Sequence, residues 1–200
     1  ILYHEGKYYL FSMYRTEKGP NHHVWSAVSD DGVHWKDVGI VITSVDREVN
    51  DIWKPFIAKA GDRFILNHGA LSKPGVQNRC VFWESKDLRH WTKLYESEPD
   101  PKWYFAGPGS RWDAMYTLPK EEGNPKAGYW GYITATVKDE LWKKGHMEGM
   151  LESADGVHWK PIAPPVFDFG KFERAFFDVG GVERIGDKYY FLGSGGSYHG

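Results

Sequence analysis

The chain has 200 residues, in which 25 Lys and Arg stand against 27 Asp and Glu, for a formal net charge of −2. This balance, without a polybasic run, gives no electrostatic basis for nucleic acid or an anionic membrane as a partner. No apolar run approaches the roughly 18 residues of a membrane-spanning helix. The 10 Trp, 12 Tyr and 11 Phe favour strands and the 23 Gly favour tight turns, so the composition predicts an all-β protein.

Short aromatic strands, each preceded by a glycine turn, recur along the chain. They cover residues 6–11, 61–66 and 186–191, with a weaker copy at 128–132. Helix signals are poor by comparison. Residues 137–147 could form one or two helical turns, but they lie inside the longest repeat and are better interpreted as an insertion.

A hairpin motif with the pattern Ser-x-Asp-[Gly/Leu]-x-His-Trp alternates with these strands. It occupies residues 29–35, 85–91 and 153–159, at spacings of 56 and 68 residues. We expect its Ser and Asp side chains to accept hydrogen bonds from nearby backbone N–H groups, and its Trp to pack between neighbouring blades. A position that recurs in every repeat is a structural one, so the three His residues of the motif are not predicted to be ligands.

Each repeat therefore holds four short antiparallel strands, which is the blade of a β-propeller. The blades are expected at approximately 1–48, 49–108 and 109–172, with an incomplete blade at 173–200. Propellers usually close with about four to eight blades, and an open stack leaves strand edges exposed. The fold class is therefore an all-β propeller, and the chain is expected to be part of a larger ring, truncated at both ends.

An aspartate stands near the start of three successive inner strands, which line the channel of a propeller. These residues are Asp51, Asp113 and Asp178, and by the same count the first blade would place its acid before Ile1. Converging carboxylates suit glycosidic cleavage, because one can protonate the leaving oxygen while another acts as nucleophile or base. Arg111 shares a strand face with Asp113 and could keep it ionised or hold a sugar hydroxyl. The alternative is that these aspartates only cap turns.

The chain resembles the five-bladed propeller glycoside hydrolases, the superfamily of families 43, 32, 62, 68 and 117. Residues 6–11 are similar to a first-blade segment that follows an Asp-Pro in these families, and residues 85–91 to their Ser-x-Asp-Leu-x-x-Trp hairpins. Residues 51–55 resemble the Trp-x-Pro segment of family 43. Residues 111–113 resemble the Arg-Asp-Pro segment of family 32, with one extra residue between Arg and Asp.

This resemblance implies a role for each acid. Asp113 would stabilise the transition state and tune the proton donor, and Asp51 would bind a sugar hydroxyl. Asp178 stands where the family has its general acid, which is usually glutamate, so Glu173 is the alternative donor. The base or nucleophile of the first blade would lie outside the chain.

Further candidates for substrate binding come from the aromatic residues and one histidine. Trp53, Trp103 and Trp112 are expected near the channel mouth, where their rings could stack on sugars. His68 follows an aromatic strand and could face the channel, where it would touch substrate or an ion. No metal site is predicted, since the pair at residues 22–23 has no third ligand at a useful spacing.

The sequence therefore predicts a glycosidase acting on a plant, algal or microbial oligo- or polysaccharide. Two alternatives stay open: a propeller that binds glycan without cleaving it, and a phosphorylase similar to family 130, for which only Arg111 and Lys54 could form the basic cluster. Carbohydrate is the expected partner. No cofactor is expected, although a structural or channel ion such as calcium is left open, as are the oligomeric state and the compartment, where a secreted or periplasmic location is slightly favoured.

Overall fold

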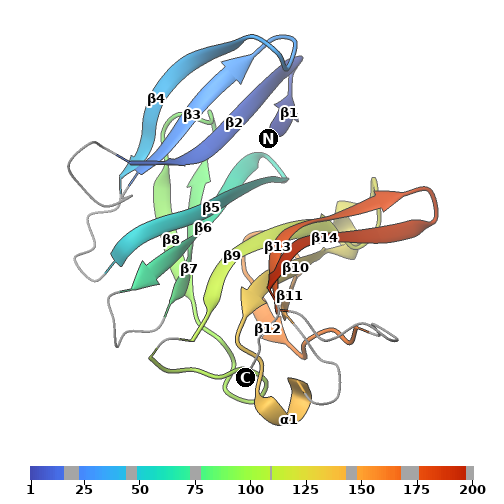
Figure 1. The fold of residues 1–200 in the computed structure, drawn as a ribbon. Helices are drawn as coiled ribbons and strands as arrows, with labels where there is room; N and C mark the ends of the chain where they lie inside the picture. Colours follow the sequence, from blue (N-terminus) through green and yellow to red (C-terminus); the bar gives the residue numbers. More distant parts are fainter. Residues whose placement is uncertain are drawn as a thin grey trace.

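The computed structural model describes residues 1–15, 23–43, 49–72, 78–108, 110–142, 148–167 and 176–196 (Figure 1). These residues are almost entirely β-structure. The strands, in chain order, are β1 (Leu2–His4), β2 (Lys7–Tyr14), β3 (His23–Ser29), β4 (Trp35–Thr43), β5 (Val49–Ala60), β6 (Arg63–Ser72), β7 (Arg79–Ser85), β8 (Thr92–Ser97), β9 (Trp112–Pro119), β10 (Tyr129–Ala135), β11 (Gly149–Ser153), β12 (Lys160–Ile162), β13 (Phe176–Ile185) and β14 (Lys188–Gly196).

The strands form three four-stranded antiparallel sheets and one two-stranded sheet, each a simple meander in chain order. We call them the first blade (β1–β4), the second (β5–β8), the third (β9–β12) and the fourth (β13–β14). The leading strands of the last three blades lie side by side, β5 against β9 and β9 against β13, and the sheets fan outward from them (Figure 1). This arrangement confirms the predicted propeller fold.

The Ser-x-Asp hairpins have the predicted turn chemistry. In the third blade the Ser153 hydroxyl accepts a hydrogen bond from Gly156 N at 2.9 Å, and Asp155 Oδ1 accepts from Val157 N at 2.9 Å and His158 N at 2.8 Å. The hairpins at residues 29–35 and 85–91 repeat these bonds. One motif therefore closes the outer hairpin of each of the first three blades, as its recurrence in the sequence predicted.

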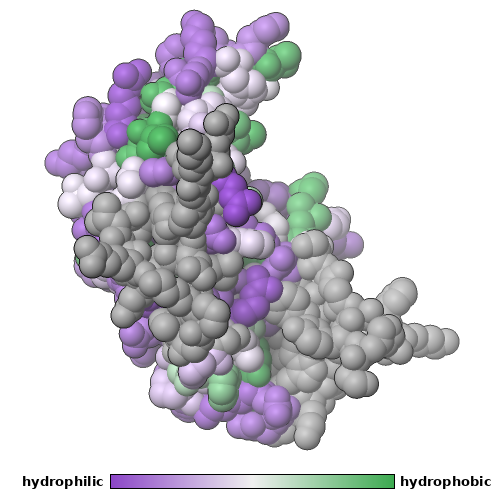
Figure 2. Space-filling model, turned by 60° about the vertical axis from the view of Figure 1, so that its left-hand side comes forward, coloured by the Kyte–Doolittle hydropathy of each residue, from purple (hydrophilic) through white to green (hydrophobic). Residues whose placement is uncertain are grey.

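Aromatic side chains from these motifs pack between blades, also as predicted. The Trp91 ring of the second blade meets Phe11 of the first edge-on, with centroids 5.6 Å apart. Trp159 of the third blade is buried in a cluster that includes Ala60 and Phe82 of the second. The blades therefore bury their hydrophobic faces against one another. Among the coloured residues of Figure 2, the hydrophobic ones lie in small separate groups.

Among the described residues, helical structure is limited to one turn on each of two connections. The 3-10 turn Pro125–Ala127 joins β9 to β10, and α1 (Asp139–Trp142) lies in the segment where the sequence allowed a turn or two. Among the described residues, no helix has the length and apolar character needed to cross a membrane.

Asp155→Asn tests how far the hairpin charge stabilises the fold. Burial acts to raise the pKa of Asp155, but the hydrogen bonds from His158 and Val157 outweigh it and lower the pKa. A carboxyl group with a lowered folded-state pKa stabilises fully above its unfolded pKa of about 4, and this contribution is lost as the pH falls through the folded-state pKa.

We therefore expect the variant to melt below the parent at neutral pH, with a gap that narrows as the pH falls below about 4. Asparagine is the matched change because its oxygen can still accept the two backbone hydrogen bonds. Thermal unfolding followed by circular dichroism measures the gap. A gap that stayed constant between pH 7 and the acid range would show that the charge contributes nothing.

Candidate active site

Two of the predicted channel aspartates meet at one arginine. Asp113 is the second residue of β9, Asp178 is the third of β13, and Arg111 immediately precedes β9. Arg111 Nε donates to Asp113 Oδ2 at 2.7 Å, and Arg111 Nη2 donates to the same oxygen and to Asp178 Oδ1, the latter at 2.6 Å. The guanidinium therefore links the inner strands of the third and fourth blades through their carboxylates.

Two further side chains, both from the second blade, complete this cluster. Asn78 Nδ2 donates to Asp113 Oδ1 at 3.3 Å, and Lys54 Nζ lies 3.1 Å from Asp178 Oδ2. Lys54 sits at an irregularity in the β5–β6 register between Trp53 and Phe56, and its φ is +43°, in the left-handed region that non-glycine residues seldom adopt. The bulge changes the direction of the Lys54 side chain. A strained backbone conformation therefore places a second cation, after Arg111, beside Asp178.

The two carboxyl groups differ in environment. The side chain of Asp113 is 6% exposed and that of Asp178 is 25% exposed. Burial raises the pKa of Asp113, although Arg111 and Asn78 oppose it. Burial also acts to raise the pKa of Asp178, but the charge of Arg111 and the hydrogen bond from Lys54 outweigh it, so that pKa is lowered. Acids with different pKa values are what acid–base chemistry requires.

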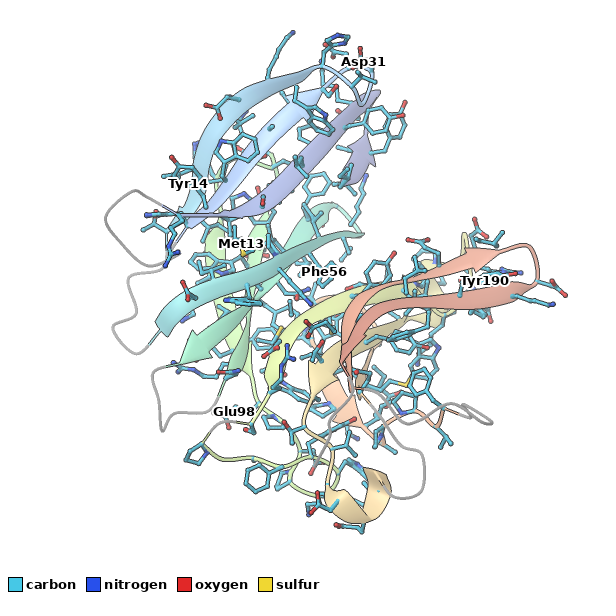
Figure 3. The ribbon with its side chains drawn as sticks, viewed as in Figure 1. Met13, Tyr14, Asp31, Phe56, Glu98 and Tyr190 are labelled. Atoms are coloured by element: carbon cyan, nitrogen blue, oxygen red, sulfur yellow. The ribbon has the colours of Figure 1, made fainter. Side chains whose placement is uncertain are left out.

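A cavity of ≈ 700 Å³ adjoins the cluster and lies between the first, second and fourth blades. Lys54 and Asp178 form its polar side, and Phe11, Met13 and Phe56 line its apolar side. Figure 3 shows Met13 and Phe56 on the strands that border this space. A cavity lined by both apolar side chains and charged groups suits a sugar, which has an apolar face and a rim of hydroxyls.

The three tryptophans predicted to stack on sugars have different environments. Trp53 is half-buried on β5, and its indole N–H is enclosed without a hydrogen-bond partner among the described residues, so Trp53 remains a candidate. Trp103 is half-buried against the core, with Lys102 Nζ 4.4 Å from its ring centroid. Trp112 is 0% exposed and donates to Ser97 Oγ at 3.2 Å. The prediction for Trp112 is therefore wrong, because no substrate can reach a buried ring.

His68 is also a core residue, so the prediction that it faces the channel is wrong. It is 1% exposed. Its Nε2 accepts from Trp83 Nε1 at 3.1 Å, and its Nδ1 lies 3.2 Å from the carbonyl oxygen of Gly69, to which it can donate. Burial lowers the pKa of His68 to about 4. A neutral imidazole whose two nitrogens are both engaged is available to neither substrate nor an ion.

Of the remaining predicted residues, the structure describes Asp51 and does not describe Glu173. Asp51 is half-buried on β5, three residues before Lys54, where it pairs with Leu71. Glu173, the alternative proton donor, lies outside the described residues. Within the part of the chain that the structure describes, no three His, Cys, Asp or Glu side chains are grouped so that they could hold a metal ion.

Sequence reasoning missed Asn78 and the ion pair that Lys54 makes with Asp178. Asn78 contacts Asp113 from the neighbouring blade, and no pattern within one repeat shows such a contact. Lys54 was considered only for its charge. Pro55 follows Lys54 in the sequence, and a proline within a strand was the one available sign that this strand would bulge.

A curated protein is similar to this chain in sequence. The levanbiose-producing levanase of Bacillus subtilis is 26% identical over 180 residues, which cover 77% of this chain and 33% of the levanase. No protein-family model matches the chain.

Solved structures show the same fold. An exo-β-1,3-galactanase from Clostridium thermocellum superposes with a TM-score of 0.72 at 17% identity, over 98% of this chain and 41% of the galactanase. The family 32 β-fructofuranosidase of Bombyx mori superposes with a TM-score of 0.69 at 15% identity, over 96% of this chain and 39% of that enzyme. These matches confirm the propeller fold. The chain spans less than half the length of these proteins.

Proposed function

We propose that the protein is a glycoside hydrolase whose active site is the channel at the starts of β5, β9 and β13. The observation that carries this proposal is the arginine-bridged pair of carboxylates, one buried and one open to an amphipathic cavity. Levanase is the name of a sequence relative, and galactanase and fructofuranosidase are the names of proteins with this fold; all three support carbohydrate as the substrate.

Each acid takes the role that its position and exposure support. Asp113 is buried and held by Arg111, so it contributes fixed negative charge that stabilises the oxocarbenium-like transition state. Asp178 is the more exposed of the two and borders the cavity, so it can reach a leaving oxygen and is proposed as the proton donor. Arg111 and Lys54 lower its pKa and favour its ionised form, so this role requires the substrate to displace these cations first. Glu173 is the alternative donor, and Asp51 is proposed to bind a sugar hydroxyl.

The experiment that tests the proposed function is hydrolysis by the whole protein across a panel of glycans. The panel holds levan and other fructans, β-1,3-galactan, plant and algal oligosaccharides, and aryl glycosides, because the matched proteins differ in substrate. We expect release of new reducing ends or free monosaccharide from at least one of them. If the protein binds a glycan of the panel but cleaves none, it is a binding propeller instead.

Adding inorganic phosphate to the same assays separates hydrolysis from phosphorolysis. Arg111 and Lys54 are the cations of the cluster, and both already pair with carboxylates, so an incoming phosphate would have to displace Asp178. We therefore expect water to be the acceptor. A sugar 1-phosphate product that depends on added phosphate would make the phosphorylase assignment correct.

Lys54→Met tests whether Asp178 is the proton donor. Lys54 favours the ionised form of Asp178, so the donor loses its proton at a low pH. Removing Lys54 should raise that pKa, and the alkaline limb of kcat/KM against pH should move to higher pH. Lys59→Met is the control, because Lys59 is exposed on the same strand. An alkaline limb that does not move in Lys54→Met would assign proton donation to Glu173.

A further inference from the structure

Each of the two linked carboxylates stands on an inner strand that is tied to the blade before it by a buried side chain. On the third blade the tie is at Met115, two residues after Asp113. Asn67 of β6 donates from Nδ2 to the Met115 carbonyl at 2.8 Å and accepts at Oδ1 from Met115 N at 2.7 Å. Asn67 is 2% exposed, and its carboxamide pairs with β9 as the peptide group of a neighbouring strand would.

The fourth blade repeats the arrangement with a different residue. Thr134 of β10 is 2% exposed, and its hydroxyl accepts a hydrogen bond from Val179 N at 3.0 Å. Val179 immediately follows Asp178. In both cases a polar side chain on the second strand of one blade therefore bonds to the backbone of the next blade's inner strand, within two residues of the carboxylate.

A third contact shows how closely the second and third blades approach beside Asp113. A Cβ built on Gly69 would lie 3.2 Å from the Asp113 Cα and 3.2 Å from the Ala114 N. Gly69 follows Asn67 by two residues on β6, so it faces the same way. Strand β6, whose Asn67 bonds to Met115, therefore also fixes the position of the Asp113 backbone by direct contact.

We propose that Asn67 and Thr134 are positioning residues, which fix the inner strands of the third and fourth blades so that Asp113 and Asp178 both reach Arg111. The inference rests on the proposed function. The guanidinium holds both carboxylates at hydrogen-bond distance, so a small shift of either strand breaks one of the bonds. A misplacement of about 1 Å can cost on the order of 100-fold in rate.

Thr134→Val in the whole protein is the main test, because valine keeps the shape and removes only the acceptor for Val179 N. We expect kcat to fall by about tenfold or more, with a shifted pH profile, and Thr134→Ser to restore both. Asn67→Leu should act in the same direction through Asp113. It leaves two buried backbone groups without partners, so its folding is checked first by circular dichroism.

Tyr95→Phe is the matched control, because it removes another tie between the second and third blades. Tyr95 Oη donates to the Val157 carbonyl at 2.8 Å and accepts from Trp159 N at 3.3 Å, in the outer part of the interface. We expect this variant to lower the melting temperature and leave kcat and the pH profile as in the parent. If Thr134→Val and Asn67→Leu also lowered only the melting temperature, they would be structural residues and the inference would be wrong.

A measurement that needs no activity separates this inference from the proposed function. The carboxyl carbons of Asp113 and Asp178 can be titrated by NMR in isotopically labelled whole protein. Thr134→Val should shift the titration of Asp178 and Tyr95→Phe should leave it unchanged, whether or not the protein cleaves a glycan. Unchanged titration in Thr134→Val would overturn the inference even in an active enzyme.

Discussion

Asp113→Asn in the whole protein is expected to lower kcat by about 100- to 1,000-fold, the usual cost of removing one preorganised charge from an active site. Asparagine has the size of aspartate and can still accept a hydrogen bond from Asn78, so the fold is retained. It lacks the negative charge that offsets the developing positive charge on the sugar ring. The side chain of Asp113 is 6% exposed and does not line the cavity, so KM should change little.

Initial-rate kinetics on the best substrate of the panel measure this effect, with Asp187→Asn as the control. Asp187 is exposed in the turn between β13 and β14, away from Arg111, so this variant should keep the rate of the parent. An Asp113→Asn variant that is folded and within a fewfold of the parent in kcat would remove Asp113 from the proposed machinery.

Arg111→Met is expected to destabilise the protein by about 3–5 kcal/mol at neutral pH, the usual cost of leaving a buried charge without its partner. The Arg111 side chain is 27% exposed, which places the effect toward the lower figure. Burial already raises the pKa of Asp113, and without the guanidinium that pKa should rise further.

The sign of the pH dependence follows from that shift. A carboxyl group whose folded-state pKa lies above its unfolded value takes up a proton in the folded state first, so acid favours the folded state. The difference in free energy of unfolding between the parent and Arg111→Met should therefore shrink as the pH falls from 7 toward about 4. Urea unfolding of both proteins at several pH values measures this difference in free energy. Arg184→Met is the control, since Arg184 is exposed on β13, and a deficit that grows on acidification would contradict the account.

The blades could be predicted from the sequence because each repeat carries its own turn chemistry. The Ser and Asp side chains of the Ser-x-Asp hairpins accept hydrogen bonds from backbone N–H groups two or three residues further on, so the turn itself depends on local sequence. The inner strands could be located by counting back from the glycine turns, which is why Asp113 and Asp178 were found.

Whether each tryptophan faces the core or the channel was harder to predict, although the sequence held one signal for Trp112. Consecutive strand residues point to opposite faces, so Trp112 and Asp113 cannot both line the channel. With Asp113 held by Arg111, Trp112 had to face the core, where it packs against Tyr104 with centroids 5.0 Å apart.

Contacts between blades were beyond sequence reasoning. Asn67 and Met115 are 48 residues apart, and Thr134 and Val179 are 45 apart, and nothing in a single repeat indicates which side chain meets which backbone. His68 shows the same limit, because its partner Trp83 lies on the next strand of the sheet. Such pairs depend on how the strands align, which the pattern of each strand alone does not specify.

The most direct test of the central claim is a crystal structure of the whole Asp113→Asn protein with an oligosaccharide that the parent cleaves. The account predicts that the sugar occupies the cavity between the first, second and fourth blades, with its glycosidic oxygen within hydrogen-bond distance of Asp178 or Glu173. A sugar bound only on the outer faces of the blades, with the ion pairs of Arg111 and Lys54 to Asp178 intact and untouched, would contradict it.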